Sequence, residues 1–473
     1  MNDVPPSGRH IHLIAICGVG MASLAGLLQA RGYHVTGSDQ NIYPPMSTYL
    51  AEIGIKVLPG FHPDHLQPTP DLVVIGNAVS RNNPEADAAL SQNIRYISFP
   101  QALGRFLIGS RTSLVVAGTH GKTTTTALAA WVLARVGWNP GFFIGGVPLN
   151  FGSGWCAGSG EHVVIEGDEY DTAFFDKGPK FLHYRPRNVI LTSVEFDHAD
   201  IYRDLDHVKS AFRKLIEIIP DDGLLVVCND YPDAKEIAAA ARCPRASYGQ
   251  TAESDWNAIN IEFREGRTFF DPCYHGKSEG RLEVNVIGRH NVMNALAVYA
   301  MGRSLGIEKE ELLSGFHGFA GVKRRQEKRG ERRGVLVIDD FAHHPTAVRE
   351  TIEAVKSAYR GRKIWAVFEP RSNTSKRSIF EHEFADALAL ADQVVLANVY
   401  QPEKVPDTER LSVENVAGLI NRRSASPKAR VIGGAAAIAS QLANAAEPGD
   451  VVLVMSNGAF DSVHEKILQA LAG

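Results

Sequence analysis

The stretch SLVVAGTHGKTTTTALAAWVLARVG, residues 113–137, decides the fold of the central part of this chain. Its short apolar run predicts a buried strand, and the segment after the glycine-rich turn has the composition of a helix. GTHGKTTT, residues 118–125, therefore lies between a strand and a helix, the context that a phosphate-binding loop requires. The alternative is a glycine turn that only caps the helix. The lysine and the four threonines favour the phosphate site.

The residues of this loop have separate predicted roles. Its glycines let backbone N–H groups turn toward phosphate oxygens, and the start of the helix adds a partial positive charge. Lys122 is expected to reach the β- and γ-phosphates of a nucleotide, and the Thr123 hydroxyl to ligate Mg²⁺. The loop residues expected to contact ATP are Gly118, Thr119, His120, Gly121, Lys122, Thr123 and Thr124.

Two acidic segments follow later strands. IEGDEYD (165–171) ends the run HVVIE, and TSVEFDHAD (192–200) follows the run NVIL. Parallel sheets keep their ligand sites at the carboxyl ends of strands, and Mg²⁺ prefers oxygen ligands. The two segments together predict a metal–nucleotide site, whereas the first one alone is equally typical of a solvated acidic loop. The side chains concerned are Glu166, Asp168, Glu169, Asp171, Glu195, Asp197, His198 and Asp200.

Length and composition limit the class of protein. A chain of 473 residues suggests about three domains, and 44% hydrophobic with 22% charged residues is typical of a soluble globular protein. The net charge of -4 argues against a nucleic-acid partner. The first residues lack the pattern of a signal peptide, no apolar run is long enough to span a bilayer, and the five scattered cysteines predict free thiols. We therefore expect a cytoplasmic protein with no membrane partner, and the oligomeric state stays open.

Strand-like apolar runs alternate with amphipathic helical stretches from end to end, which predicts an α/β protein with parallel sheets. The predicted domain boundaries give residues 1–112, 113–322 and 323–473. The stretch 251–286 is more polar and lacks a helical period, so a small antiparallel insertion is expected there. The charged run KRRQEKRGERR, residues 323–333, is interpreted as a mostly solvated face at a domain junction.

Six segments together resemble the Mur ligases of bacterial cell-wall synthesis: GTHGKTTT, EGDEYD, EFDHAD, GRHNVMNALA, RRQE and DDFAHHP. They occur in the family's order and cover most of the chain. The resemblance implies a Rossmann-like UDP-sugar-binding domain (1–112), a central P-loop ATPase domain (113–322) and a Rossmann-like C-terminal domain (323–473) that binds the amino compound. It also implies an enzyme that forms an amide bond with the use of ATP and Mg²⁺.

The resemblance implies that Thr123 and Glu166 hold one Mg²⁺ and that His198 holds a second. Arg325 would reach the phosphates from the third domain. A carboxylate must first become an acyl phosphate before an amine can attack it, and both steps concentrate negative charge. The predicted catalytic residues are therefore Lys122, Arg325 and His198.

By the same resemblance, Asn291 would contact the adenine of ATP, with His290 beside it, and Asp340 would bind the ribose. One departure concerns the carbamylated lysine that supports the second metal in several family members. This chain has Phe212 or Arg213 at that place, with Lys209 and Lys214 nearby, and the presence of a carbamylated lysine stays open.

The N-terminal segment ICGVGM (16–21) places Gly18 and Gly20 after a strand, with Asp39 at the end of the next strand. A dinucleotide-binding fingerprint needs a third glycine where this chain has Ser23, so the NAD interpretation is weakened. The same geometry suits the pyrophosphate of a UDP-sugar. The segment also resembles the N-terminal part of family members that use UDP-N-acetylmuramate, and this resemblance implies that Gly18, Gly20, Met21, Ser38, Asp39, Asn77 and Ser80 bind that sugar nucleotide.

Further segments resemble the family members that join the murein tripeptide L-alanyl-γ-D-glutamyl-meso-diaminopimelate to UDP-N-acetylmuramate in peptidoglycan recycling. These are SDQNIYPPMSTYL, GGVPLNFG, DEYDTAFFDK, FEPRSNT and VMSNGAF. The alternative is the branch that adds L-alanine to the same sugar. An arginine can bind both oxygens of a peptide carboxylate, although Arg371 could equally be an ordinary surface residue. The expected peptide-binding residues are Arg371, Ser372, Asn373, Thr374, Ser456 and Asn457.

Other function classes explain less of the sequence. An NAD-dependent Rossmann oxidoreductase leaves the phosphate loop without a role, and NADH fluorescence on mixing would test it. A nucleotide switch or transport ATPase predicts ATP turnover without a UDP-sugar. Nucleic-acid binding would rest on residues 323–333, which lack aromatic side chains and include two glutamates. For His343 and His344, packing or a phosphate contact is expected in place of a metal-ligand role.

Overall fold

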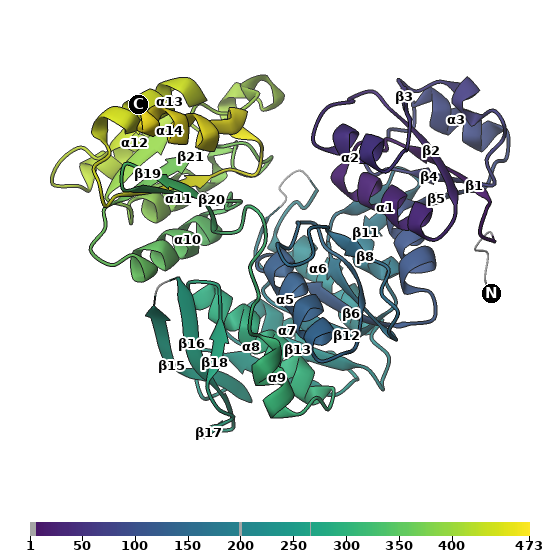
Figure 1. Cartoon of the computed structure of the whole chain (residues 1–473), viewed down its shortest axis with the longest axis horizontal. Helices are drawn as coiled ribbons and strands as arrows, with labels where there is room; N and C mark the ends of the chain where they lie inside the picture. The colour runs from purple at the N-terminus through teal and green to yellow at the C-terminus, as the bar shows by residue number, and fades with distance from the viewer. Residues whose placement is uncertain (1–5, 198–200, 265) are drawn as a thin grey trace.

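The computed structural model describes residues 6–197, 201–264 and 266–473, and it contains three large sheets with helices packed against them. In Figure 1 the N-terminal unit (purple) and the C-terminal unit (yellow) lie on either side of the central one. The α/β class and the three-unit organisation predicted from the sequence are confirmed.

The N-terminal sheet has five parallel strands in the order β3-β2-β1-β4-β5. A buried polar link crosses it, in which a Glu85 carboxylate oxygen lies 2.5 Å from His12 Nε2 and accepts a hydrogen bond from the Ser38 hydroxyl at 2.9 Å. This link fastens α3 to the first two strands. The elements are β1 His10–Ile14, α1 Val19–Ala30, β2 His34–Asp39, α2 Met46–Glu52, β3 Val57–Pro59, β4 Leu72–Ile75, α3 Pro84–Ser91, β5 Tyr96–Ser98 and α4 Phe99–Ala102.

In the central sheet, β6 (Thr112–Ala117) lies between β12 (Pro186–Leu191) and β9 (His162–Gly167), parallel to both. Because most residues of these strands are buried, each strand contains a short continuous apolar run. α5 (Lys122–Arg135) and α8 (Arg289–Ser304) share the core on one face of this sheet. The remaining elements are β7 Gly141–Phe143, β8 Trp155–Cys156, β10 Asp171–Ala173, β11 Asp176–Pro179, α6 Leu205–Glu217, β13 Leu224–Cys228, α7 Pro232–Ala238, β14 Arg245–Gly249 and α9 Lys309–Gly315.

The predicted antiparallel insertion is present as an extension of this sheet. β15 (Trp256–Arg264) pairs antiparallel with β16 (Arg267–Tyr274), which also pairs with β17 (Lys277–Ser278) and β18 (Leu282–Val284). The strands lie beside the C-terminal end of β14 and give the central unit a second, smaller lobe (Figure 1).

The C-terminal sheet has the order β19-β20-β24-β21-β22-β23, parallel except for β19. Residues 323, 328, 329 and 331–333 of the charged run are exposed, as interpreted, whereas residues 324–327 and 330 are half-buried. Residues 327–332 also form the edge strand β19. Its lack of apolar alternation hid this strand, and charges on an edge discourage pairing with other chains. The elements are β19 Glu327–Arg332, β20 Val335–Asp340, α10 Pro345–Ala358, β21 Ile364–Phe368, α11 Glu381–Leu388, β22 Gln393–Leu396, α12 Val413–Arg422, β23 Ala429–Val431, α13 Ala435–Ala445, β24 Val451–Met455 and α14 Val463–Ala472.

Hydrogen bonds hold the units against one another. The Trp155 indole N–H donates to the Tyr49 hydroxyl at 3.1 Å, between the central and N-terminal units. The Thr374 hydroxyl donates to the Asp197 carboxylate at 2.7 Å, between the C-terminal and central units. Each outer unit is therefore bonded to the central one.

The cysteines and the helices agree with two expectations from composition. All five cysteines are free thiols. Among the helices that the structure describes, none has the length and apolar character needed to cross a membrane.

Candidate active site

The phosphate loop turns sharply at the carboxyl end of β6. Gly118 and Gly121 have positive φ angles of 131° and 80°, which favour glycine. A Cβ atom on Gly118 would lie 2.2 Å from Thr192 Oγ1 and 2.8 Å from the Ser193 backbone nitrogen. The loop is also bonded to this neighbouring segment, since the His120 N–H donates to the Ser193 hydroxyl at 2.9 Å. The backbone shape is therefore fixed before any ligand binds.

Lys122 lies between this loop and the first acidic segment. Its ammonium group donates to the two carboxylate oxygens of Glu169 at 3.1 and 2.9 Å and to the Gly118 carbonyl at 2.6 Å. Burial alone would lower the pKa of Lys122, but attraction from Glu169 and Asp168 offsets it and raises the pKa overall. The lysine is thus a fixed cation beside the loop. The sequence named Glu169 only among the possible metal ligands, and its role as the partner of Lys122 was missed.

Thr123, Glu166 and Arg325 meet at the start of α5. Arg325 Nη2 donates to Thr123 Oγ1 at 3.2 Å, so the third unit does reach the phosphate loop. Glu166 accepts from the Gly145 N–H at 3.0 Å, and burial raises its pKa, against the opposing effect of that hydrogen bond and of Arg325. A carboxylate and a hydroxyl are the hard oxygen donors that Mg²⁺ prefers, so this pair fits the predicted metal. His198, the predicted ligand of a second ion, lies outside the described residues.

The residues predicted for adenine and ribose are joined through Gln326, which the sequence did not single out. The Asn291 amide donates to the Gln326 side-chain oxygen at 3.2 Å, and the Gln326 N–H donates to the Asp340 carboxylate at 2.8 Å. His290 Nε2 lies 3.3 Å from the Gln326 amide nitrogen. Burial lowers the pKa of His290 to about 4, with Arg325 acting in the same direction, so its imidazole is neutral near pH 7.

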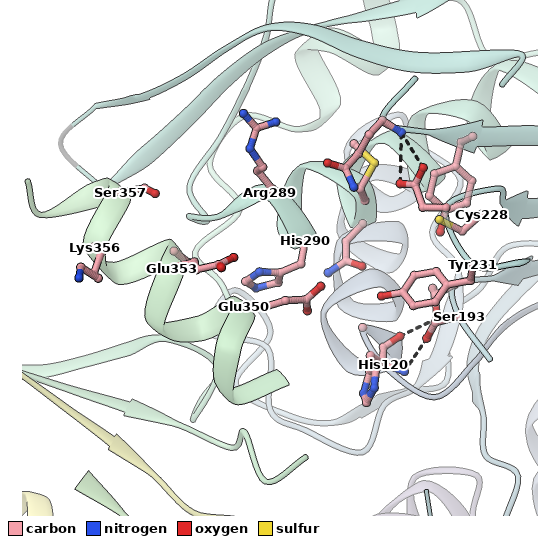
Figure 2. Close-up of a pocket in the computed structure, with 18 of the residues that line it drawn as sticks. His120, Ser193, Cys228, Tyr231, Arg289, His290, Glu350, Glu353, Lys356 and Ser357 are labelled. Carbon is pink, nitrogen blue, oxygen red and sulfur yellow. Dashed lines mark hydrogen bonds between the residues drawn. The ribbon is translucent and has the colours of Figure 1, made fainter. Parts of the chain in front are cut away.

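A cavity of about 720 Å³ opens beside the phosphate loop between α8 and α10. Figure 2 shows His290 from α8 and Glu350 from α10 projecting into it, with His120 of the loop at its lower edge. Burial raises the pKa of Glu350 to about 7, and repulsion from Glu195 adds to the shift while His120 opposes it. The residues that line the cavity include His120, Gly121, Tyr231, His290, Asn294 and Glu350. Glu350 was not found from the sequence, because it lies within a helix whose facing side is decided by domain packing.

His120 takes part in a second cluster at the edge of this cavity. Its Nε2 lies 2.9 Å from a Glu195 carboxylate oxygen, which also accepts from the Thr346 hydroxyl at 2.9 Å. The ring of His344 lies 4.8 Å from that of His120. Burial lowers the pKa of His344 to about 4, and His120 contributes in the same direction. The cluster joins the phosphate loop to the segment that precedes α10.

The N-terminal candidate residues form a partial site. Asp39 accepts from the Cys17 N–H at 2.9 Å and from the Asn41 N–H at 2.8 Å, which fixes the loop before α1 against the end of β2. Gly18 is the N-cap of α1 and Gly20 lies in its first turn, whereas Met21 is buried in the core and Ser38 is bonded to Glu85.

Asn77 faces the central unit. Its amide nitrogen donates to the carbonyls of Asp171 and Thr172 at 2.6 and 2.5 Å. Ser80 is exposed beyond it. Asn77 therefore joins the N-terminal unit to the hairpin of β10 and β11 that follows Glu169.

The C-terminal candidates gather around a carboxylate that the sequence did not identify. Ser456 donates to Glu369 at 2.6 Å, and a nitrogen of the Arg371 guanidinium lies 3.6 Å from the same carboxylate. The guanidinium also stacks on Tyr400, 3.7 Å from the ring centroid. Glu369 directly precedes the PRSNT segment, at the carboxyl end of β21, and that position was the available signal.

The other predicted peptide ligands have different surroundings. Thr374 is buried, and its hydroxyl donates a hydrogen bond to Asp197. The Ser372 hydroxyl is bonded to that of Ser375 within a turn. Asn373 is exposed, and the side-chain oxygen of Asn457 is buried without a hydrogen-bond partner among the described residues.

These features define a nucleotide-dependent phosphoryl-transfer enzyme: a phosphate loop, a fixed lysine, a carboxylate–hydroxyl pair suited to Mg²⁺ and an arginine supplied by a second unit. Three family models match the chain: the Mur ligase family catalytic domain at residues 10–111, the Mur ligase middle domain at 116–302 and the Mur ligase glutamate ligase domain at 324–458. The chain belongs to the Mur ligase family, and it is, as predicted, an ATP-dependent ligase that forms an amide bond. The domain boundaries at 112/113 and 322/323 stay predictions.

Relatives within the family differ in substrate. A UDP-N-acetylmuramate–L-alanyl-γ-D-glutamyl-meso-2,6-diaminoheptandioate ligase from Escherichia coli is 41% identical, over 98% of this chain and 98% of that protein. A UDP-N-acetylmuramate–L-alanine ligase from Alkaliphilus metalliredigens is 34% identical over 95% of each chain. The crystal structure of a murein peptide ligase from Psychrobacter arcticus is 37% identical, with a TM-score of 0.72 over 98% of this chain and 99% of that one.

Proposed function

We propose that this enzyme joins the tripeptide L-alanyl-γ-D-glutamyl-meso-diaminopimelate to UDP-N-acetylmuramate with ATP, in peptidoglycan recycling. The observation that carries the proposal is the 41% identity over 98% of both chains to a ligase named for these substrates. The alternative, addition of L-alanine to the same sugar, rests on relatives of 34% identity and is less supported.

The proposed chemistry has two steps. The lactyl carboxylate of the sugar attacks the γ-phosphorus of ATP, which gives an acyl phosphate and ADP. The α-amino group of the tripeptide then attacks the acyl carbon, and the tetrahedral intermediate expels inorganic phosphate as the amide forms and the amine loses a proton. Lys122 and Arg325 supply fixed positive charge where negative charge accumulates in both steps. Neither step needs a nucleophile from the protein.

The phosphate loop is the proposed site of the ATP phosphates. In the structure Lys122 is bound by Glu169, so we propose that the γ-phosphate takes over part of this pairing when ATP binds. The purine is proposed to lie near Asn291 and His290, at the mouth of the cavity, with its ribose toward Asp340.

Thr123 and Glu166 are the residues that would hold Mg²⁺, with His198 as the predicted ligand of a second ion. Bound there, Mg²⁺ would offset the charge of the phosphate oxygens. Arg325, which donates to the Thr123 hydroxyl at 3.2 Å, would turn toward the transferred phosphoryl group.

We propose that the UDP-sugar binds at Gly18, Gly20 and Asp39 in the N-terminal unit. Arg371 of the C-terminal unit is proposed to bind a carboxylate of the tripeptide, held in place by Tyr400 and Glu369. ATP and UDP-sugars are cytoplasmic metabolites, so the cytoplasm is the proposed location of the reaction.

The test is phosphate release with ATP, Mg²⁺ and UDP-N-acetylmuramate, with the tripeptide or L-alanine as acceptor. Release that requires the sugar and prefers the tripeptide, with the amide product confirmed by mass, is the expected result. A preference for L-alanine would move the enzyme to the alternative branch. Release that ignores both the sugar and the acceptor would contradict ligation altogether.

A further inference from the structure

We propose that His120, Glu195 and His344 form a binding site for a divalent transition-metal ion such as Zn²⁺, separate from the Mg²⁺ site at Thr123 and Glu166. One ligand atom from each of the three side chains lies within 4.8 Å of the others. Two imidazoles and one carboxylate are a donor set that Zn²⁺ prefers, whereas Mg²⁺ prefers oxygen donors. The sequence alone gave His344 no ligand role, because its partners come from distant segments.

The distances are close to those of a metal-bound site. His120 Nε2 lies 2.9 Å and His344 Nδ1 lies 3.9 Å from the same oxygen of Glu195. Ligand atoms bonded at about 2.0–2.2 Å to a tetrahedral ion are about 3.3–3.6 Å apart. The two distances to Glu195 differ from this separation by about half an ångström, and the two imidazole nitrogens lie within 4.8 Å of each other, so adjustments of about an ångström or less per side chain would bring the three atoms around one ion. Three protein ligands leave a fourth position for water.

The hydrogen bonds around the cluster orient its ligand atoms. His344 Nε2 lies 3.2 Å from the carbonyl oxygen of Phe196, which can only accept, so Nε2 carries the hydrogen. The lone pair is then on Nδ1, the atom that faces Glu195. The Thr346 N–H also points at Nδ1, but at 3.3 Å this bond is long enough for a metal ion to displace. The Thr346 hydroxyl holds the Glu195 carboxylate at 2.9 Å. Such outer contacts are the usual means of orienting metal ligands.

The cluster is withdrawn from solvent but can still be reached. The side chains of His120, Glu195 and His344 are 13%, 28% and 7% exposed, and His120 lines the open cavity of Figure 2. A bound ion would join the phosphate loop to the segment before α10, and so the central unit to the C-terminal unit.

The test uses Co²⁺ as a spectroscopic substitute for Zn²⁺ on the full chain, freed of metal and without nucleotide. Four- or five-coordinate Co²⁺ absorbs visible light far more strongly than hydrated Co²⁺. We expect one equivalent of Co²⁺ to give this absorption, one equivalent of Zn²⁺ to abolish it and excess Mg²⁺ to leave it unchanged. Glu195→Gln and His344→Ala should each weaken Co²⁺ binding by about 100-fold or more.

Two control variants separate this site from its surroundings. His343→Ala removes the neighbouring histidine and Glu166→Gln removes the proposed Mg²⁺ ligand, and both should keep the absorption. Glu195→Gln preserves the size and packing of the side chain, so its result does not depend on the folding of His344→Ala. Absent absorption in the wild-type chain, equal Co²⁺ affinity in Glu195→Gln and the wild type, or displacement by Mg²⁺ would each overturn the proposal.

Discussion

Replacement of Lys122 by methionine separates the two roles that the structure gives this lysine. Methionine keeps most of the unbranched side chain and removes its charged end. Glu169, whose side chain is 2% exposed, would lose the ammonium group that lies 2.9 and 3.1 Å from its carboxylate. Removal of one partner of a buried ion pair destabilises a protein by about 3–5 kcal/mol. We expect a value of about 3 kcal/mol, because Lys122 is itself 15% exposed.

This loss is measurable as a shift in thermal unfolding. For a unit of the size of the central domain, about 3 kcal/mol corresponds to a decrease of about 6–12 °C in the unfolding midpoint. The double variant Lys122→Met, Glu169→Gln should recover most of this decrease, because it removes both charges and keeps both shapes. Its ligase activity should nevertheless stay about 10²–10³-fold or more below wild type, because no fixed cation faces the transferred phosphoryl group.

The assay is differential scanning calorimetry together with phosphate release, on the wild type, both single variants and the double variant. Ligase activity near the wild-type level in the double variant would refute the proposed role of Lys122 in phosphoryl transfer. An unchanged unfolding midpoint in Lys122→Met would refute the argument that Glu169 depends on it.

Three further outcomes are expected. Arg371→Ala should raise KM for the tripeptide by about 10–100-fold with little change in kcat, since a charged hydrogen bond contributes about 1.5–3 kcal/mol; steady-state kinetics that show an unchanged KM would remove Arg371 from the peptide site. Burial raises the pKa of Glu350 from 4.5 to about 7, so the folded state holds this proton more tightly than the unfolded state, and stability is lost as pH rises from about 4.5 to about 7. The stability gained by Glu350→Gln should therefore increase by about 1–2 kcal/mol between pH 5 and pH 8, and equal unfolding shifts at both pH values would contradict this. Gly118→Ala should lower ATP affinity by about 10-fold or more, because the new Cβ atom would lie 2.2 Å from Thr192 Oγ1. Gly137→Ala is the control, since Gly137 also has a positive φ but has open space around it. ATP titration of this variant should give an affinity near that of the wild type.

Much of the fold could be predicted because the central strands are buried on both faces. β6, β20 and β24 are continuous apolar runs, and such runs are the strongest local signal in a sequence. β19 and the β10–β11 hairpin were missed. β19 is a polar strand at a sheet edge, and β10 and β11 are short strands that form a separate two-stranded sheet, so neither has the apolar run of a central strand.

The candidate site was predictable where one local segment supplies it. The loop from Gly118 to Thr124 was predicted from its glycines and lysine, and Arg325 was predicted from the family resemblance. The partners of these residues were not, because Glu169, Gln326 and Glu350 owe their positions to contacts between distant segments. Which of several acidic residues reaches a lysine depends on packing that no local pattern records.

One short piece of chain connects the two proposed binding sites for ATP and the sugar nucleotide. Glu169 bonds to Lys122 at the phosphate loop, and two residues later the Asp171 carbonyl accepts from Asn77 of the N-terminal unit. If ATP draws Lys122 away from Glu169, residues 169–171 lose their contact with the phosphate loop. The same residues keep their hydrogen bond to Asn77, in the unit where the sugar nucleotide is proposed to bind. Thermodynamic linkage requires such an influence to be mutual: the factor by which ATP changes affinity for the sugar must equal the factor by which the sugar changes affinity for ATP. The free energy of binding both substrates is the same whichever of the two binds first.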